Sequence, residues 1–298
     1  MTGFKVWFLE TRPQFLLLSV VLAFLGTSIA FYDGAFHLGY ALLAFFGLLL
    51  SHISVNVLND YFDYKSGIDL ETKRTPVSGG SGILPAAQLT PKQAFRFGIG
   101  AFLLAVGIGI YFIVARGLLL LPLLAVAAVC ILLYTPFILK LKIPEWAAGL
   151  GMGTLPILGA YFVQTTFYTP QAVIASIPSG ILVHNLLLLN EFPDVDADKK
   201  GGRKTMPIVL GKKKAGLVYS VLTLVVYFWI IGGVAAGQMP AFSLIALLTI
   251  PLAMKAIRGA RKPEEPGYLM PAMGNSVLVV LLTQLLMGSG YILADIFR

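Results

Sequence analysis

Two short clusters of acidic and amide residues are the parts of this sequence best suited to chemistry. Their polar members are, in chain order, Asn56, Asn59, Asp60 and Asp63 in the first cluster and Asn190, Asp194, Asp196 and Asp198 in the second. A helix that continues through the first cluster would project Asn56, Asp60 and Asp63 from one face, because they are three or four residues apart. Pro193 interrupts the second cluster and must kink or restart the helix there.

Carboxylates gathered in this way repel one another unless a cation compensates their charge. Neither cluster contains Cys or His, and oxygen donors alone suit a hard ion. Mg²⁺ in particular binds a few carboxylates together with phosphate oxygens of a substrate. The alternative is that each cluster is a solvated acidic cap that ends a helix. Because the two clusters match in spacing, we favour a metal site.

Basic residues and glycines follow both clusters directly. The first is followed by Lys73-Arg74-Thr75-Pro76-Val77-Ser78-Gly79-Gly80 and the second by Lys199-Lys200-Gly201-Gly202-Arg203-Lys204. This composition is expected at a diphosphate site, because Lys and Arg donate charge-assisted hydrogen bonds and glycines let backbone N–H groups approach closely. Membrane topology alone also explains many of the basic residues. Their position beside the acids favours phosphate binding.

The overall composition indicates what must position these clusters. Of 298 residues, 57% are hydrophobic and only 12% are charged, and the mean hydropathy is +0.84. A soluble domain has about 25% charged residues, so the chain is predicted to be an integral membrane protein. The net charge of +8 could indicate nucleic-acid binding, but the basic residues lie between apolar segments, which favours topology and no nucleic-acid partner. The single cysteine, Cys130, excludes a disulfide within the chain.

Nine apolar segments are expected to cross the bilayer, which takes about 20 helical residues each. Their expected bounds are 14–32, 39–58, 93–115, 118–139, 146–166, 171–189, 215–236, 241–256 and 270–296. The first could be a cleaved signal with a small-residue site at 28–30, but its apolar stretch exceeds the roughly 7–15 residues of a signal, so we expect it to remain as a helix. Gly149, Gly151 and Gly153 are expected to permit close helix packing.

The distribution of Lys and Arg predicts the orientation. With nine spans, every Lys and Arg except Arg116 and Arg298 falls on the same side as the amino terminus. The positive-inside rule therefore predicts a cytoplasmic amino terminus in the cell membrane and a carboxyl terminus on the opposite side. Two long polar loops, at about 60–92 and 191–214, follow the acidic clusters on the cytoplasmic side. Long loops between packed spans commonly carry function.

In these features the chain resembles the UbiA-type intramembrane prenyltransferases over essentially its whole length. The similarity rests on Asn56-x-x-Asn59-Asp60-x-x-Asp63, on Arg74-x-Pro76-x-Ser78-Gly79, and on Asn190-x-x-x-Asp194-x-Asp196-x-Asp198 followed by Gly202-Arg203-Lys204-Thr205. The resemblance implies an all-α membrane protein with nine transmembrane helices in a single bundle, in which cytoplasmic loops cap a central cavity. It also implies one domain over residues 1–298.

Within that family, the stretch from Asn59 to Asp69 is most similar to the 1,4-dihydroxy-2-naphthoate prenyltransferases of menaquinone synthesis. The hydroxybenzoate branch more often has a third Asp soon after the second, where this chain has Lys-Ser-Gly at 65–67. The resemblance implies Mg²⁺-dependent transfer of a polyprenyl group from an allylic prenyl diphosphate to a dihydroxynaphthoate-like aromatic acceptor in lipid-quinone biosynthesis. The alternative acceptors are 4-hydroxybenzoate, geranylgeranylglyceryl phosphate and a haem or chlorophyll precursor.

The same resemblance implies roles for individual residues. The ligands implied for two Mg²⁺ ions are Asn56, Asp60 and Asp63 for one and Asn190, Asp194 and Asp198 for the other. The four aspartates among them are implied to be catalytic. The residues implied to bind substrate are Asn56, Arg74, Tyr134, Lys140, Asn190 and Lys204. Of these, Tyr134 and Lys140 lie in the short cytoplasmic loop expected after the fourth span.

The implied reaction begins when the diphosphate leaves with its charge neutralised, and the carbocation that results needs a dry cavity in the bilayer. The proton of the acceptor could pass to Asp198, to Glu191 or to the diphosphate. His52 could contact the acceptor or be hydrogen-bonded to a neighbouring helix.

Two other classes of membrane protein are alternatives. A transporter or cation channel would have acidic groups near the bilayer midplane, whereas the acids here are at the ends of spans. A phosphatidyltransferase of the CDP-alcohol type would contain an Asp-Gly-x-x-Ala-Arg opening, which this sequence lacks.

Overall fold

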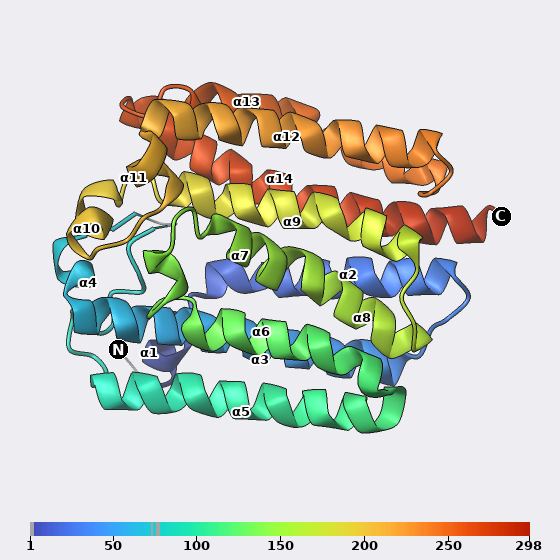
Figure 1. The fold of residues 1–298 in the computed structure, drawn as a ribbon, viewed down its shortest axis with the longest axis horizontal. Coiled ribbons are helices and arrows are strands. Elements are labelled where there is room, and N and C mark those ends of the chain that lie inside the picture. The colour runs from blue at the N-terminus through green and yellow to red at the C-terminus, as the bar shows by residue number, and fades with distance from the viewer. Residues whose placement is uncertain (1–2, 73, 76–77) are drawn as a thin grey trace.

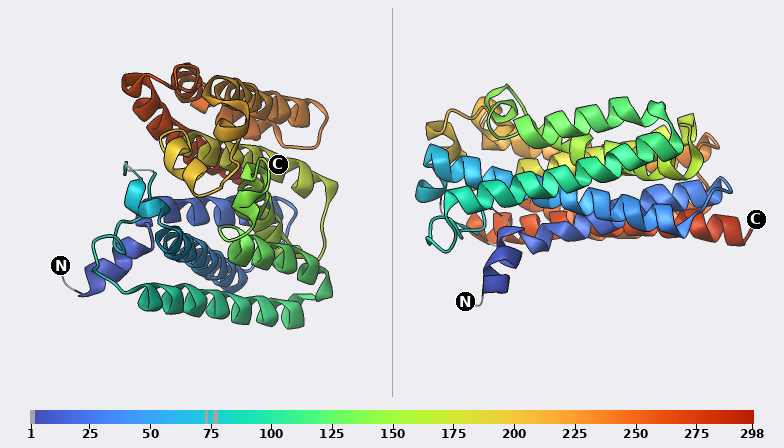
Figure 2. Two further views of the ribbon diagram at one scale, coloured as in Figure 1. Left: turned by 60° about the vertical axis from the view of Figure 1, so that its left-hand side comes forward. Right: turned by 90° about the horizontal axis from the view of Figure 1, so that it is seen from below.

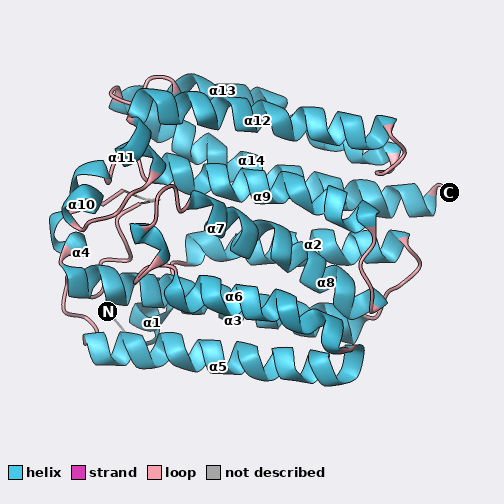
Figure 3. Cartoon of the chain, viewed as in Figure 1, coloured by secondary structure: helices cyan, strands magenta, loops and turns pink. Residues whose placement is uncertain are grey.

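The structure, a computed structural model, describes residues 3–72, 74–75 and 78–298. Throughout these residues the regular structure is helical and no strand occurs, which confirms the prediction of an all-α protein (Figure 3). The long helices are α2 (Pro13–Tyr32), α3 (Leu38–Ser66), α5 (Pro91–Arg116), α9 (Pro170–Asn190), α12 (Lys212–Ala235) and α14 (Pro266–Ile296). Lys73 and Pro76, which belong to the motif after the first acidic cluster, lie outside the described residues.

Three further apolar segments are assembled from shorter helices. They are η1 (Leu118–Leu120) with α6 (Leu121–Leu133), then α7 (Glu145–Gly149) with the π-helical turn η3 (Leu150–Thr154) and α8 (Leu155–Thr165), and lastly η4 (Ala241–Thr249) with α13 (Ile250–Ala260). The remaining elements are α1 (Gly3–Glu10), α4 (Ile68–Glu71), η2 (Ile138–Lys140), α10 (Val195–Lys200) and α11 (Met206–Leu210).

Eight segments in the described part of the chain are long and apolar enough to cross a membrane. They correspond to eight of the nine predicted spans, and the other, Leu118–Leu133, is a shorter apolar helix. The chain is therefore a multi-pass membrane protein. The largest difference from the predicted bounds is in α3, which continues to Ser66 rather than ending near Leu58.

The axes of the long helices are roughly parallel, and the polar elements gather at one end of the bundle (Figure 1). Figure 1 shows α4, α10 and α11 together at this end, with the carboxyl terminus at the other. Helix α1 lies towards the same end and is turned away from the bundle axis (Figure 2). The segments that follow the two acidic clusters are thus brought together by the bundle rather than by proximity in the sequence.

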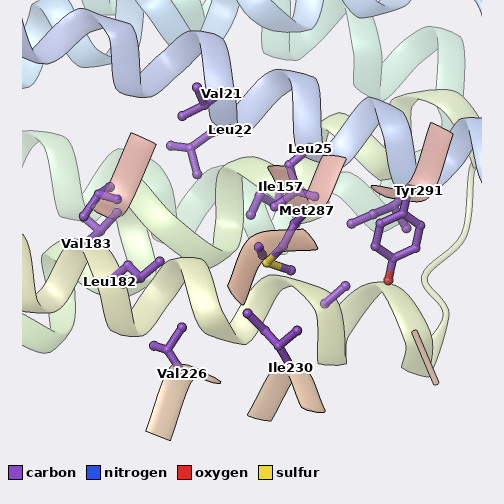
Figure 4. Close-up of a cluster of buried hydrophobic side chains, with 14 of the residues drawn as sticks. Val21, Leu22, Leu25, Ile157, Leu182, Val183, Val226, Ile230, Met287 and Tyr291 are labelled. Carbon is purple, nitrogen blue, oxygen red and sulfur yellow. The ribbon is translucent and has the colours of Figure 1, made fainter. Parts of the chain in front are cut away.

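The largest buried cluster of apolar side chains joins α2, α8, α9, α12 and α14. Figure 4 shows Leu22 and Leu25 of α2 close to Ile157 of α8 and Met287 of α14, and all four side chains are essentially inaccessible. Close helix packing is needed here because helices in a bilayer associate through packing rather than through the hydrophobic effect.

Glycines permit close helix contact, as the sequence predicted for Gly149, Gly151 and Gly153. A Cβ atom added at Gly153 would lie 2.7 Å from Cα of Gly180 in α9, and one at Gly149 would lie 2.6 Å from the Gly180 carbonyl oxygen. A Cβ atom at Gly151 would lie 3.0 Å from Cβ of Cys130. These glycines hold the α7–η3–α8 segment against α9 and α6, and so shape the cavity between them.

Candidate active site

A cavity of about 330 Å³ lies within the bundle, and its polar end is at the acidic clusters. The polar and charged residues that line this end are Arg12, Asn56, Asn59, Asp63, Asp69, Tyr134, Asn190, Glu191, Asp194, Asp198 and Arg203. Six of the ten site residues predicted from the sequence are among them: Asn56, Asp63, Tyr134, Asn190, Asp194 and Asp198. The structure thus brings the two clusters to one cavity.

The first cluster lies on one continuous helix. Because α3 runs on to Ser66, Asn56, Asp60 and Asp63 are all buried on the side facing the bundle. Asn59 joins this cluster to the segment that follows α6, because its amide donates to Asp63 Oδ2 (3.1 Å) and to Thr135 Oγ1 (3.0 Å).

The loop after α4 folds back over the first cluster. Ser81 donates its backbone N–H to Asp60 Oδ2 (2.7 Å) and its hydroxyl to Glu10 Oε2 (2.9 Å). Gly80 makes this approach possible: its φ is +71°, and a Cβ atom there would lie 3.1 Å from Asp69 Oδ2 and 3.4 Å from Asp60 Oδ1. Asp60 is therefore covered by the loop and lies beside the cavity rather than on its wall.

The second cluster is divided between two helices, as the position of Pro193 predicted. Helix α9 ends at Asn190, Asp194 precedes the first turn of α10, and Asp198 lies within α10. Asn190, Asp194 and Asp198 therefore share the cavity wall without sharing a helical face.

One guanidinium group joins the two clusters. Arg203 donates through Nη1 to Asp198 Oδ1 (2.7 Å) and through Nη2 to Asp63 Oδ1. The side chain is largely buried, as are both carboxylates. The resemblance assigned Lys204 to substrate binding, but the structure places its neighbour Arg203 at the acids.

A second arginine at the site was not predicted from the sequence. Arg12 lies between α1 and α2 with φ +55°, and it donates through Nη1 to Asn59 Oδ1 (3.2 Å). The same atom is 3.7 Å from Asp60 Oδ1, and the guanidinium lies 5.0 Å from the Phe15 ring centroid. The available signal was a basic residue immediately before Pro13, at the amino-terminal end of the first predicted span.

The three basic residues that the resemblance assigned to the diphosphate lie elsewhere. Arg74, Lys140 and Lys204 are exposed, and none of them lines the cavity. Arg74 donates to the Ser81 carbonyl, while the backbone of Lys204 pairs with Leu139 and Ile143. Lys140 is the last residue of η2.

Several oxygen atoms at the site have no hydrogen-bond partner among the described residues. They are Asp60 Oδ1, Asp69 Oδ2, Asn190 Oδ1, Asp194 Oδ1 and both carboxylate oxygens of Glu191. Within the part of the chain that the structure describes, no three His, Cys, Asp or Glu side chains converge closely enough to hold an ion alone. Mg²⁺ needs no such cage, because it keeps waters and shares phosphate oxygens with its substrate. The unpartnered oxygens therefore fit this ion.

The ionisation of these acids shows a deficit of positive charge. Burial, reinforced by the charges of Asp63 and Asp60, raises the pKa of Asp69 to about 8. Burial and the charge of Asp198 raise the pKa of Asp194 to about 7. Arg12 and Arg203 only partly offset these effects, since both lower the pKa values of the two acids. A divalent cation bound beside these acids would supply the missing positive charge.

Beside the second cluster lies a group that the sequence only partly indicated. Glu191 and Tyr134 line the cavity, and the Tyr134 hydroxyl has no hydrogen-bond partner among the described residues. Glu145, which has no exposed surface, lies next to Glu191 and accepts a hydrogen bond from the backbone N–H of Met206. Burial raises the pKa of Glu191 well above its usual value.

His52 lies farther into the membrane-spanning part of the cavity. Its Nδ1 is 2.9 Å from Ser19 Oγ of α2, and its side chain also lines the cavity. The two roles expected for it, a hydrogen bond to a neighbouring helix and contact with a substrate, are thus compatible in one position.

Comparison with known proteins agrees with this geometry. Residues 16–270 match the model of the UbiA prenyltransferase family. A 1,4-dihydroxy-2-naphthoate octaprenyltransferase from Bacillus subtilis is 30% identical over 89% of this chain and 85% of its own length. A protein of the same name from Escherichia coli is 25% identical, covering 98% and 96%, and a 2-carboxy-1,4-naphthoquinone phytyltransferase from Synechocystis is 26% identical, covering 96% and 93%.

Solved structures share the fold. A UbiA homologue from Aeropyrum pernix aligns with a TM-score of 0.73 at 18% identity, covering 93% of this chain and 97% of that one. A UbiA homologue from Archaeoglobus fulgidus bound to GPP and Mg²⁺ aligns with a TM-score of 0.63 at 14% identity, covering 95% and 99%. The chain belongs to the UbiA prenyltransferase family and is a membrane-embedded prenyltransferase.

Proposed function

We propose that this prenyltransferase transfers a polyprenyl group from an allylic prenyl diphosphate to a dihydroxynaphthoate-like aromatic acceptor. The observation that carries the proposal is the meeting of two carboxylate clusters and two buried arginines at one end of an apolar cavity. The relatives from Bacillus subtilis and Escherichia coli, both named for 1,4-dihydroxy-2-naphthoate, support this acceptor.

Mg²⁺ would be held at the polar end of the cavity. We assign one ion to Asn56, Asp60 and Asp63 and a second to Asn190, Asp194 and Asp198. The homologue from Archaeoglobus fulgidus bound to GPP and Mg²⁺ supports the choice of Mg²⁺ and of a prenyl diphosphate as substrate. When bound there, Mg²⁺ would supply the positive charge that the departure of a diphosphate requires. Asp69 is available beside the first set, because it is buried, lines the cavity and has an unpartnered oxygen.

The residues of this chain contribute charge and shape. Arg12 and Arg203 would bind the diphosphate, because both reach the acids from the cavity wall and a guanidinium matches phosphate geometry. The apolar remainder of the cavity would exclude water from the reactive prenyl cation. The acceptor ring would then attack C1 of the prenyl group and lose a proton.

The proposal includes a topology. We propose nine spans, with Leu118–Leu133 as the one shorter than the rest, and with the amino terminus and the loops around the site in the cytoplasm. The support is the concentration of Lys and Arg on one side of the predicted spans. A cysteine introduced at Ser66, which is exposed at the end of α3, in a Cys130→Ala background should resist a membrane-impermeant maleimide in intact cells and react after lysis. Labelling in intact cells would show that the protein has the opposite orientation.

The activity is tested in proteoliposomes with Mg²⁺ and geranylgeranyl diphosphate. Dihydroxynaphthoate, 4-hydroxybenzoate and geranylgeranylglyceryl phosphate are supplied separately, and products are identified by mass spectrometry. The last acceptor is included because a digeranylgeranylglyceryl phosphate synthase from Pyrococcus horikoshii is 25% identical. We expect prenylated dihydroxynaphthoate only.

The matched variants are Asp60→Asn and Asp196→Asn. Asp196 belongs to the second cluster but is exposed and does not line the cavity. We expect Asp60→Asn to abolish the product and Asp196→Asn to retain it. A product formed with another acceptor would mean that the proposed acceptor is wrong. Full activity in both variants would contradict the assignment of Asp60 to a metal site.

A further inference from the structure

His52 is a polar residue inside the cavity that the reaction proposed above leaves unused. It lies in the membrane-spanning part of α3, and its side chain is 5% exposed and lines the cavity. Asn56, assigned to the first Mg²⁺, comes four residues later and projects from the same face of the helix, about 6 Å farther along its axis. His52 is thus one helical turn inward from the metal end of the cavity.

One side of the His52 imidazole is held by a neighbouring helix. Its Nδ1 lies 2.9 Å from the hydroxyl oxygen of Ser19 in α2. Ser19 has no exposed surface and does not line the cavity, so it acts on the contents of the cavity through His52. The Ser19 hydroxyl has no second hydrogen-bond partner among the described residues. The two side chains therefore form a pair, which fixes the orientation of the ring.

The other ring nitrogen, Nε2, has no hydrogen-bond partner in the part of the chain that the structure describes. Because Nδ1 is turned to α2, Nε2 is the polar atom that His52 presents to the cavity. A polar atom without a partner in an apolar region is costly, so a polar group of a bound molecule is expected to meet it. A hydroxyl group suits both tautomers of the ring, since it can donate to Nε2 or accept from it.

Other polar groups at this depth of the cavity are engaged or weak. Of the described lining residues inward of Asn56, those with polar side chains are Ser51, His52 and Cys130. Ser51 donates its hydroxyl to the Gly47 carbonyl (2.9 Å), and a thiol such as that of Cys130 is a weak donor and acceptor. A polar substituent of a substrate at this depth is therefore expected to bind at His52.

The wall beside the pair suits a flat ring. Phe15 lines the cavity four residues before Ser19, so it lies one turn nearer to the polar end on the same side of α2. The Arg12 guanidinium is 5.0 Å from the centroid of the Phe15 ring. An aromatic acceptor held between α2 and α3 would thus lie against Phe15, with Arg12 at one end and His52 at the other. It would be beside C1 of the prenyl group, because C1 is bonded to the diphosphate.

We propose that His52 Nε2 binds a hydroxyl group of the aromatic acceptor, and that Ser19 is a positioning residue that orients the imidazole for this bond. The inference rests on the proposed function, because it takes the acceptor to be a hydroxylated ring. The pair selects acceptors that carry oxygen at this position, since without it Nε2 stays unpaired. The hydrogen bond also fixes the ring relative to C1 of the prenyl group.

Steady-state kinetics in proteoliposomes with Mg²⁺, geranylgeranyl diphosphate and dihydroxynaphthoate tests the pair. His52→Ala should raise the KM for the acceptor about 10- to 100-fold, the effect of leaving a buried polar group unpaired. The KM for the prenyl diphosphate should stay within about twofold of the wild type. Ser19→Ala should raise the KM for the acceptor about two- to tenfold, the net effect of losing one hydrogen bond, because the ring remains but can turn.

Two amide substitutions distinguish the two ring nitrogens. The amide of Gln reaches about as far as Nε2 and can donate and accept, whereas the amide of Asn reaches only as far as Nδ1. His52→Gln should therefore recover most of the affinity for the acceptor that His52→Ala loses, and His52→Asn should recover little. Both variants keep a polar side chain, so the difference between them tests the contact even if His52→Ala does not fold.

Acceptor analogues measure the contact directly. The compounds 1-hydroxy-2-naphthoate and 4-hydroxy-2-naphthoate each lack one hydroxyl of dihydroxynaphthoate, and both are measured as competitive inhibitors. The analogue without the bound hydroxyl should inhibit the wild type about tenfold more weakly than the other. Both should inhibit His52→Ala alike, because the contact that distinguishes them is absent.

His184→Ala and Ser54→Ala are the matched controls. His184 belongs to α9 and does not line the cavity, and its Nδ1 is 3.2 Å from Asn185 Oδ1. Ser54 is fully buried two residues after His52 and does not line the cavity. Both variants should keep the KM for the acceptor and the ratio of inhibition constants of the wild type.

The outcomes separate this pair from the proposed function. A rise in the KM for the acceptor that is confined to the His52 and Ser19 variants, with loss of discrimination between the analogues in His52→Ala, supports the pair. An unchanged KM for the acceptor in His52→Ala, an equal rise in the KM for the donor, or equal rises in the controls overturns the pair and leaves prenyl transfer in place. Absence of transfer by the wild-type protein to any aromatic acceptor removes the proposed function and the pair with it.

Discussion

Asp63 and Asp198, which come from opposite halves of the chain, accept hydrogen bonds from the same guanidinium group. Arg203 donates to both, and its side chain is largely buried between them. Two buried carboxylates this close to one cation would otherwise repel each other in a region of low dielectric constant. Arg203 thus holds the two clusters next to each other when no substrate is bound.

The first prediction follows from this bridge. Arg203→Ala should lower kcat/KM for the prenyl diphosphate about 100-fold, the typical effect of removing one buried donor from a developing anion. Arg203→Lys should recover little, because one ammonium cannot serve both carboxylates in the way that a planar fork does. Steady-state kinetics with varied donor measures both effects.

Lys204→Ala is the control for the same experiment. Lys204 is adjacent, equally basic and exposed, and it does not line the cavity. We expect its kcat/KM to stay within about twofold of the wild type, as for surface substitutions generally. A large loss in Lys204→Ala together with a small one in Arg203→Ala would show that the diphosphate is bound from the loop side.

The choice between Arg203 and Lys204 illustrates what a sequence can predict here. Spans could be located because about 20 apolar residues are an unmistakable signal. The first acidic cluster could be located because its spacing matches one helical face, and the second because it repeats the same residue types at the end of another span. Which of two neighbouring basic side chains turns inward depends on the path of the chain after α10. That path is set by tertiary contacts, such as the hydrogen bond from Lys204 N to Leu139 O.

Arg12 was missed for a related reason. It precedes the first span by one residue and carries no motif, so its sequence position indicates topology only. It enters the site because Asn56 donates to the Thr11 carbonyl (3.0 Å) and holds the turn between α1 and α2 against α3. A contact between positions 11 and 56 leaves no local pattern. The helical framework is therefore predictable, while the cationic half of the site depends on turns.

A second prediction concerns the loop that covers Asp60. Gly80→Ala should abolish most activity while the helical bundle stays folded, because the new Cβ atom would lie 3.1 Å from Asp69 Oδ2 in a conformation with φ +71°. The left-handed conformation alone costs an L-residue about 1–2 kcal/mol. Product formation and the thermal melting temperature in detergent are measured together.

Gly202→Ala separates backbone strain from the contact with the acids. Gly202 has φ +76°, and an added Cβ atom would meet nothing within 4 Å. It should lose stability to a similar extent as Gly80→Ala and keep much more of its activity. Equal activities in the two variants would show that the loop over Asp60 is not needed for the reaction.

A third prediction tests the packing that shapes the cavity. Gly153→Val should prevent stable folding, because even its Cβ atom would lie 2.7 Å from Cα of Gly180, and backbone cannot move aside easily. Gly232→Ala, in α12 with nothing within 4 Å, is the control, and it should be neutral or stabilise by up to about 1 kcal/mol. Size-exclusion chromatography in detergent after heating measures the folded fraction. A monodisperse, heat-stable Gly153→Val protein would contradict the helix contact.

The last prediction concerns pH, Mg²⁺ and stability, and it uses the acids outside the spans. The pKa of Asp69 is raised to about 8 and that of Asp194 to about 7, in both cases chiefly by burial. Between their unfolded values near 4 and these folded values, the folded state binds more protons than the unfolded state. The free energy of unfolding must therefore fall as pH rises from about 4 to about 8 when no metal is present. Mg²⁺ binds the deprotonated carboxylates, so it should restore more stability at pH 8 than at pH 6.

Thermal melting of the purified protein with EDTA or with Mg²⁺, at pH 6 and at pH 8, measures all four combinations. We expect the melting temperature with EDTA to be lower at pH 8, and the increase caused by Mg²⁺ to be larger there. Asp69→Asn removes the group with the higher pKa and cannot ionise, so it should reduce the difference between the two pH values with EDTA. Asp196→Asn changes an exposed carboxylate and should leave that difference unchanged. A melting temperature with EDTA that rises between pH 6 and pH 8 would mean that the buried acids are already compensated by Arg12 and Arg203, and the need for a metal at this site would lose its physical basis.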